Sequence, residues 1–172
     1  MPPDHPWTRS RLLQARGALL VTRAAAAAPR PAPGQPGAAS DYVQPEPDIF
    51  VALLASGEVL AFNGHVDLGT GVRTALGQIV AEELDLPPSM VRVVLGHTGC
   101  APNQGPTIAS ATIQISAIPL RRAAAQAAGH LRGMAAHWLE VDADQVRSEA
   151  GVYSAGMQPE RSVTQAQLLE GR

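Results

Sequence analysis

The sequence predicts an α+β fold, in which a small sheet, formed by a hairpin and further strands, carries two main helices on one face. Two runs of strand-forming residues flank Ser56-Gly57, a turn signal typical of a β-hairpin. Apolar residues recur at intervals of three and four over residues 74–84, which indicates a helix with one buried face. With a third strand and a second helix, the order is β-β-α-β-α-β, and 172 residues fit one ordinary domain.

The N-terminal part differs in composition from the rest of the chain. Residues 24–47 hold six prolines among alanines and glycines, and such a segment cannot bury enough surface to offset the entropy lost on ordering. We therefore expect residues 1–47 to form an extended Pro/Ala-rich arm, with one short helix or strand around residues 11–22. Residues 48–172 are expected to form the ordered domain.

The elements of this domain follow from local pattern. Residues 49–54 and 58–62 form the hairpin, the helix over residues 74–84 stops at Pro87-Pro88, and residues 91–95 are a third strand. A long loop over residues 97–108 precedes a second helix over residues 110–139, in which Pro119 ends or kinks the first part. Residues 145–152 resemble a strand, and residues 162–169 resemble the start of a helix. The predicted core is Ile49, Val51, Leu53, Val59, Ala61, Leu76, Ile79, Val80, Leu84, Val91, Val93, Leu95, Ile113, Ala117, Leu120 and Ala124.

Charge and composition exclude several classes of protein. Thirteen Lys and Arg against fifteen Asp and Glu give a net charge of −2 without a run of like charge, so the chain has no basic nucleic-acid footprint. Aromatic residues make up only 3%, which does not support a base-stacking surface. Cys100 is the only cysteine, so no internal disulfide or thiolate metal cluster can form. No apolar run is long enough for a membrane span or a signal peptide, and we expect a cytoplasmic protein.

Two loops rich in Gly and Thr or Ser, each followed directly by a helix, form the candidate binding site. We call residues 64–71 the first loop and residues 103–112 the second loop. Glycine lets a backbone approach a ligand closely, and the first turn of a helix offers unpaired N–H groups to anions. In the first loop, Gly69, Gly71 and the Thr70 hydroxyl either hold a polar cofactor group or form a tight connection in which Thr70 caps the helix. The second loop has the same two interpretations, with Thr107 or Ser110 as the cap.

Three charged or titratable residues near the loops carry hypotheses. Arg73 either pairs with a phosphate or is a solvent-exposed arginine at the helix start. His65 and His97 flank the two loops and could meet in space, but two histidines are a poor metal site, and a structural role as polar loop residues is favoured. No arrangement of residues supports nucleophilic or acid–base catalysis, so we predict no catalytic residue and no metal ligand in this chain.

Two long blocks resemble the molybdenum hydroxylase superfamily, which includes xanthine dehydrogenase and aldehyde oxidase. They are DIFVALLASGEVLAFNGHVDLGTGVRTALGQIVAEELDLPPSMVRVVLG and APNQGPTIASATIQISAIPLRRAAAQA. They are specifically similar to the N-terminal portion of molybdopterin-binding large subunits of the nicotinate dehydrogenase and isoquinoline 1-oxidoreductase type. By this resemblance, residues 48–172 would be part of a larger molybdopterin-binding domain.

The resemblance implies a cofactor and the residues that contact it. The cofactor would be molybdopterin cytosine dinucleotide, which carries a molybdenum ion. The family's Gly-Gln-Gly loop reads Gly69-Thr70-Gly71 here, and threonine is too short to reproduce the contact of a glutamine amide. The family's Thr-x-Ala-Ser segment, which contacts the pyrophosphate region of the cofactor, corresponds to Thr107, Ala109, Ser110, Ala111 and Thr112.

The chain departs from the family in length. Large subunits run to several hundred residues and carry a Gly-x-Gly-Glu segment, whose glutamate is the catalytic base; this chain has no such segment and should not catalyse hydroxylation alone. The implied partners are the remainder of the subunit, an iron–sulfur (2Fe–2S) small subunit and, in some relatives, a cytochrome c subunit, through which the complex could associate with the inner membrane. The complete enzyme would oxidise an N-heterocycle or an aldehyde with water as the oxygen source. Two alternatives are a truncated, non-catalytic remnant or interaction fragment without cofactor, and an α/β module that binds another phosphate ligand.

Overall fold

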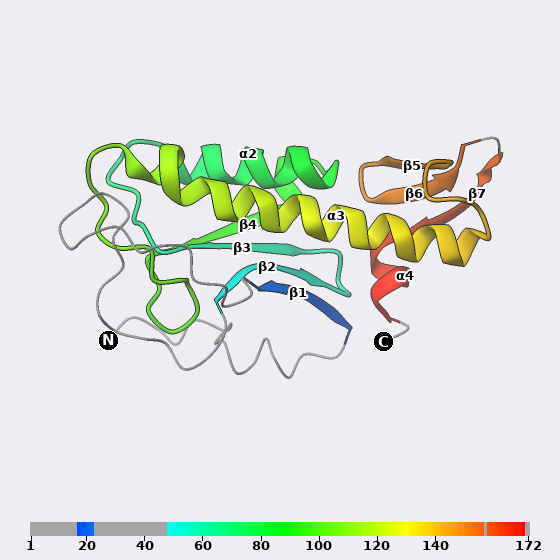
Figure 1. Ribbon diagram of the computed structural model, residues 1–172, viewed down its shortest axis with the longest axis horizontal. Coiled ribbons are helices and arrows are strands. Elements are labelled where there is room, and N and C mark those ends of the chain that lie inside the picture. Colours follow the sequence, from blue (N-terminus) through cyan, green and yellow to red (C-terminus); the bar gives the residue numbers. More distant parts are fainter. Residues whose placement is uncertain (1–16, 23–47, 157, 171–172) are drawn as a thin grey trace.

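The computed structural model describes residues 17–22, 48–156 and 158–170. In these residues a four-stranded sheet has the order β1-β2-β3-β4, and a three-stranded sheet has the order β5-β6-β7 (Figure 1). The strands are β1 (Ala18–Thr22), β2 (Ile49–Leu54), β3 (Val59–Asn63), β4 (Val91–Leu95), β5 (Val146–Glu149), β6 (Val152–Ala155) and β7 (Gln158–Thr164). The helices are α2 (Val72–Leu84), α3 (Ala117–Leu139) and α4 (Gln165–Glu170), with a 3₁₀ turn η1 (Pro88–Met90) and a π-helical turn η2 (Thr112–Ser116). The predicted α+β class is confirmed.

The four-stranded sheet combines antiparallel and parallel pairing. β2 and β3 form the predicted hairpin, with Val51 opposite Ala61 and Leu53 opposite Val59. β3 and β4 run parallel, and α2 connects them, as parallel strands require a crossover. Since Asn63 lies opposite Leu95, both strands end at the same edge, and the two loops leave the sheet side by side.

The first strand comes from the segment expected to be the arm. β1 pairs antiparallel with β2 along its whole length, within the range where a short helix or strand was expected. Residues 1–16 and 23–47, on which the rest of the arm prediction falls, lie outside the described residues. The described domain therefore includes residues 17–22 as well as residues that follow Pro47.

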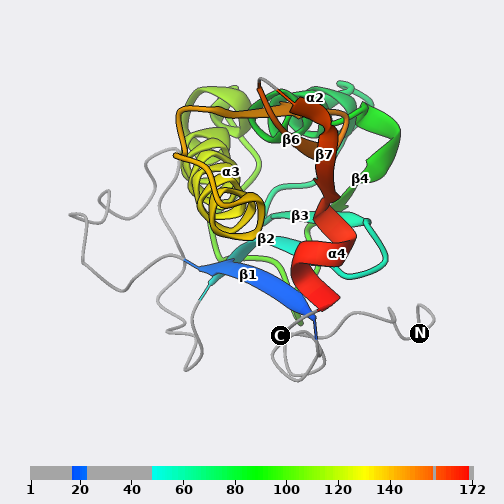
Figure 2. The same cartoon turned by 90° about the vertical axis from the view of Figure 1, so that its right-hand side faces the viewer.

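Helices α2 and α3 cover one face of the four-stranded sheet, as Figure 2 shows end-on. Pro119 does not break α3, which runs continuously over Ala117–Leu139. Proline lacks an N–H group, and it is tolerated here because it lies in the first turn of α3, directly after the irregular π-helical turn. The C-terminal half of α3 packs against β5, β6 and β7, so one helix supports both sheets.

The C-terminal region differs from the sequence prediction. The strand predicted over residues 145–152 is two strands, because Ala150 and Gly151 have positive φ values of 50° and 79° and turn the chain. β7 was not predicted, since six of its seven residues are exposed and no apolar alternation marks it. The helix predicted from residue 162 begins at Gln165.

Both faces of the four-stranded sheet are buried. Most of the predicted core lies in the cluster beneath α2 and α3, with Ile79, Val91 and Leu95 partly buried at its margin. Ile113 was predicted to be in the core and is 42% exposed, because the π-helical turn changes the direction of its side chain. The opposite face has its own cluster, which consists of Ile49, Ala52, Leu54, Leu60, Phe62, Val94 and Cys100. No helix in the described residues is long and apolar enough to span a membrane.

Candidate functional site

The two loops are joined by hydrogen bonds at the edge where β3 and β4 end. The Gly64 amide donates to Gln104 Oε1 at 2.8 Å, and the Val66 amide donates to Thr107 Oγ1 at 3.0 Å. α2 and η2 then begin at this same end of the molecule, on the left in Figure 1. The structure therefore brings the predicted first and second loops together.

Gly64 allows this close approach. A Cβ atom at Gly64 would lie 2.2 Å from the Pro102 carbonyl oxygen and 3.1 Å from the Gln104 amide nitrogen. Both neighbours are backbone atoms, which cannot rotate away as a side chain would. Glycine at this position is thus required by the packing of one loop on the other.

His65 is fully buried between the loops and has hydrogen-bonding partners on both ring nitrogens. Nδ1 lies 2.8 Å from Thr112 Oγ1, while Nε2 lies 3.2 Å from Ser116 Oγ and 3.3 Å from the Gln104 carbonyl oxygen. Its amide donates to Asn63 Oδ1 at 3.0 Å, and Asn63 Nδ2 donates to the Ser116 carbonyl. This network agrees with the favoured interpretation of His65 as a structural residue.

His97 makes its contacts within the turn that follows β4. Its Nδ1 atom accepts a hydrogen bond from the Gly99 amide at 3.2 Å and lies 3.3 Å from Cys100 Sγ. Within the described residues, no group of three or more His, Cys, Asp or Glu side chains could hold a metal ion.

Asp67 organises the first loop. Its Oδ1 atom accepts hydrogen bonds from the amides of Gly69 at 3.0 Å, Thr70 at 2.9 Å and Gly71 at 3.2 Å, and Oδ2 accepts one from the Arg73 amide at 3.2 Å. These backbone hydrogen bonds, that of Arg73 first, hold the pKa of the Asp67 carboxyl below its ordinary value. Gly69 and Gly71 have φ values of 89° and 74°, which glycine adopts without strain.

The capping role suggested for Thr70 is therefore wrong. Helix α2 has Gly71 at its N-cap with no side-chain cap, and the Thr70 hydroxyl instead lies 3.4 Å from Asp67 Oδ1. The sequence carried a signal for Asp67, because aspartate often accepts hydrogen bonds from backbone amides two or more residues ahead. Sequence reasoning missed it.

The second loop contains two kinds of residue: some whose hydroxyls bond to other residues of the protein, and others that are exposed. Thr107 Oγ1 accepts from the Val66 amide near the surface, and the Thr112 hydroxyl is buried against His65, so both hydroxyls have partners within the protein. Ala109 and Ser110 are exposed and have positive φ values of 50° and 56°. The turn at Ala111 has no side-chain cap, so the capping role suggested for Thr107 or Ser110 is also wrong.

Arg73 lies apart from the outer surface of the loops. It is exposed, and its guanidinium group donates to the Val93 carbonyl on β4. There it lines a cavity of about 460 Å³ between α2 and β4, together with Thr74, Gly77, Gln78, Pro88, Val91, Arg92 and Val93.

Exposed apolar side chains lie within the two loops and in the helical turns that follow the second loop. We define the apolar rim as Val66, Leu68, Ile108, Ile113, Ile115 and Ile118, whose exposed fractions range from 41% to 73%. They come from the first loop, the second loop and the beginning of η2 and α3. Large apolar side chains gathered near a polar loop are typical of an interaction surface.

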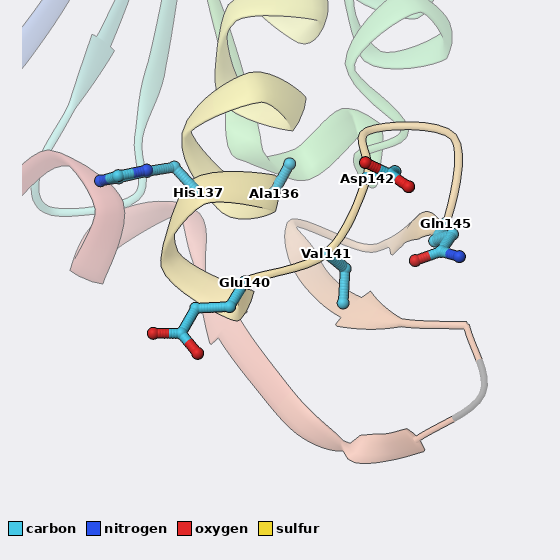
Figure 3. A pocket seen from close by; sticks show the side chains of 6 residues that line it. All are labelled: Ala136, His137, Glu140, Val141, Asp142 and Gln145. Atoms are coloured by element: carbon cyan, nitrogen blue, oxygen red, sulfur yellow. The ribbon is translucent and has the colours of Figure 1, made fainter.

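A second cavity lies at the far end of α3. It measures about 530 Å³ and is lined by Ala136, His137, Glu140, Val141, Asp142 and Gln145. Figure 3 shows that the side chains of His137, Glu140 and Asp142 point in different directions. They do not converge on one point, so the loops remain the better candidate site.

Comparison with known protein families agrees with the sequence blocks. The pattern of the molybdopterin cofactor-binding domain matches residues 17–171. A subunit of nicotinate dehydrogenase from Pseudomonas putida is 46% identical over 165 residues, which cover 96% of this chain and 14% of that protein. The gamma subunit of the 6-hydroxypseudooxynicotine dehydrogenase complex of Paenarthrobacter nicotinovorans is 30% identical over 103 residues, 60% of this chain and 13% of that protein.

Solved structures share the fold. Quinoline 2-oxidoreductase from Pseudomonas putida 86 superposes with a TM-score of 0.61 at 26% identity, covering 70% of this chain and 15% of that one. The Cu,Mo-CO dehydrogenase superposes with a TM-score of 0.60 at 26% identity, covering 69% of this chain and 15% of that one. The chain therefore belongs to the molybdopterin cofactor-binding domain family of the molybdenum hydroxylases. It spans between 13% and 15% of the length of these relatives.

Proposed function

We propose that this chain supplies one wall of a molybdopterin site in a molybdenum-dependent hydroxylating dehydrogenase, and that the cofactor is the cytosine dinucleotide form. One observation carries the proposal: two loops from a molybdopterin-binding fold are fixed to each other at one sheet edge. Beside the apolar rim, the exposed residues of these loops include Gly69, Thr70, Gly71, Ala109 and Ser110.

The residues of this surface fit a flat, polar group. A Cβ atom added at Gly69 or Gly71 would meet nothing within 4 Å, so a ligand can reach the backbone there. Ser110 is exposed, and the Thr70 hydroxyl lies at the surface, 3.4 Å from Asp67 Oδ1, so a ligand could reach both hydroxyls. Thr107, Ala111 and Thr112 would hold the second loop in shape from below rather than contact the cofactor first.

Arg73 has a smaller part in this proposal than its sequence position suggested. Because its guanidinium donates to the Val93 carbonyl, contact with a phosphate would require the side chain to rotate away from β4. We retain Arg73 as a candidate phosphate contact only if its side chain rotates away from the Val93 carbonyl.

The chemistry would belong to the bound group. When bound, the molybdenum cofactor supplies the centre that hydroxylates an N-heterocycle or an aldehyde with oxygen from water. The residues of this chain would bind and orient the cofactor, and the apolar rim would exclude water around it. None of its residues is proposed to be catalytic, and the chain is not proposed to be active alone.

The proposed partner is the remainder of a molybdopterin subunit. The chain covers 14% of its 46% identical relative, and the apolar rim lies beside the loops where further protein would complete the site. An iron–sulfur (2Fe–2S) subunit and a cytochrome c subunit are proposed as electron acceptors. The second candidate function is a non-catalytic fragment that keeps the fold without the cofactor.

The test is to co-express the chain with a polypeptide that carries the rest of the subunit and to measure molybdenum and acid-released cytidine monophosphate in the purified complex. Near-stoichiometric amounts of both are expected. Ser110→Glu, which adds bulk and charge at the loop surface, should lower both roughly tenfold, whereas Ser162→Glu, on exposed β7, should not. Absence of both molybdenum and nucleotide from the wild-type complex would overturn the proposal in favour of the non-catalytic fragment.

A further inference from the structure

The first loop looks like an anion site, but a side chain of the same loop occupies it. Four consecutive or nearly consecutive amides, those of Gly69, Thr70, Gly71 and Arg73, point toward the Asp67 carboxylate within 3.2 Å. Such a set of converging N–H groups at a helix start is what a phosphate oxygen ordinarily binds.

Both carboxylate oxygens take part. Oδ1 accepts three amides and the longer contact from the Thr70 hydroxyl, and Oδ2 accepts the Arg73 amide. A ligand anion would have to displace Asp67 to reach these donors, and it would then lie beside a displaced negative charge. Charge repulsion and the loss of four hydrogen bonds both oppose this exchange.

Among the residues that the structure describes, no cation is paired with Asp67. The guanidinium of Arg73 donates to the Val93 carbonyl instead. Among the described residues, Asp67 forms no ion pair, and the ion pairs that do form there join Arg92 to Glu58 and Arg121 to Glu83. The first loop therefore presents one negative charge whose partners are all backbone amides and a hydroxyl.

We propose that Asp67 is a positioning residue: it fixes the backbone of the first loop and keeps phosphate and similar anions out of the loop's amide groups. The part of any ligand that meets this loop is then uncharged or a hydrogen-bond donor, and it meets the open Cα faces of Gly69 and Gly71 and the Thr70 hydroxyl. This inference concerns the loop itself and holds whichever ligand the chain binds, so it can fail or succeed independently of the molybdopterin proposal.

The first arm of the test follows amide hydrogen exchange in the ¹⁵N-labelled 172-residue chain by NMR. Asp67→Ala should speed exchange at all four amides, by roughly tenfold, as expected when a cap-type acceptor is lost. Asp67→Asn keeps an oxygen in place of Oδ1 and puts an NH₂ group in place of Oδ2. Exchange at Gly69, Thr70 and Gly71 should then stay close to the wild-type rate, while exchange at Arg73 speeds up.

The second arm adds inorganic phosphate at constant ionic strength. The amide resonances of residues 69–71 should show no saturable shift in the wild-type chain or in Asp144→Ala, an exposed aspartate on a distant turn. They should shift saturably in Asp67→Ala, in which the amides are released. Unchanged exchange rates in Asp67→Ala would overturn the positioning role. Saturable phosphate shifts in the wild type, or none in Asp67→Ala, would overturn the exclusion of anions.

Discussion

His65 Nδ1 and Thr112 Oγ1 lie 2.8 Å apart in the interior of the protein, although 47 positions separate the two residues in sequence. This contact joins the first loop to the beginning of the π-helical turn that follows the second loop. Because His65 is completely buried, water cannot replace a lost partner. The relative position of the two loops thus depends on a polar contact beneath the surface they present.

Removal of the Thr112 hydroxyl should therefore destabilise the chain. Thr112→Val keeps the shape of the side chain but leaves a buried ring nitrogen without a partner, which costs about 1–3 kcal/mol. Thr74→Val makes the same chemical change on the exposed surface of α2 and should alter the free energy of unfolding by no more than about 0.5 kcal/mol. Urea denaturation followed by circular dichroism measures both, and equal effects of the two variants would contradict the role given to Thr112.

Two glycine substitutions should have opposite effects, because Gly64 lies where the loops pack closely and Gly133 lies on the open surface of a helix. Gly64→Ala should destabilise the chain by at least about 2 kcal/mol, since the new Cβ would lie 2.2 Å from the Pro102 carbonyl oxygen. Gly133→Ala, on the exposed surface of α3, meets nothing within 4 Å and should stabilise by about 0.5–1 kcal/mol through helix propensity. Thermal unfolding measures the stability of both variants. A Gly64→Ala variant as stable as the wild type would show that the loops can move apart.

Alkaline pH should destabilise the chain through Tyr153 on β6. Burial raises the pKa of this phenol to about 12; a weaker effect of Arg132 lowers the pKa, and Asp85 raises it. The raised pKa favours the neutral phenol in the folded state. The stabilisation is therefore complete below pH 10 and is lost as the pH rises from 10 towards 12, by about 2–3 kcal/mol in total.

Urea denaturation between pH 9 and about 12 measures this loss. Tyr153→Phe should have a flatter dependence of unfolding free energy on pH over the same interval, because no phenol remains to ionise. A wild-type profile as flat as that of the variant would show that Tyr153 ionises normally in the folded chain.

The apolar rim should make the isolated chain associate with itself. Sedimentation velocity is expected to show concentration-dependent oligomers, and Leu68→Ser combined with Ile115→Ser should weaken association roughly tenfold without lowering stability by more than about 0.5 kcal/mol per site. Val152→Ser, an equally simple change on exposed β6 away from the loops, is the control and should leave association unchanged. A stable monomer at all concentrations would contradict this account of the rim.

Much of the fold could be predicted because its signals are local. The hairpin of β2 and β3, helix α2 and strand β4 all lie where turn residues and apolar spacing placed them. β7 has no apolar alternation to mark it, and its place is set by pairing with β6. Ile113 failed as a core prediction because a π-helical turn, which sequence spacing does not reveal, changes the direction of its side chain.

The two loops could be located from the sequence, but the groups that they present could not. Spacing and composition located both loops, but the spatial arrangement decides which groups face outward. The hydroxyls of Thr107 and Thr112 contact other residues of the protein, whereas Ser110 is exposed. Asp67 could have been suggested by the tendency of aspartate to accept hydrogen bonds from backbone amides ahead of it. The number of its amide contacts could not, because it depends on the positive φ angles of Gly69 and Gly71.

The pairing of β1 with β2 has a consequence for how the chain folds. The hairpin of β2 and β3 and the meander of β5, β6 and β7 join residues that are close in sequence, whereas β1 reaches β2 only across the long interval between Thr22 and Ile49. Closing such an interval is slow compared with forming local contacts, so we expect β1 to join the sheet late. Until it does, β2 is an edge strand of apolar residues whose outer backbone groups are unpaired. We expect aggregation during synthesis to begin from this partly folded chain, in which β1 has not yet joined the sheet.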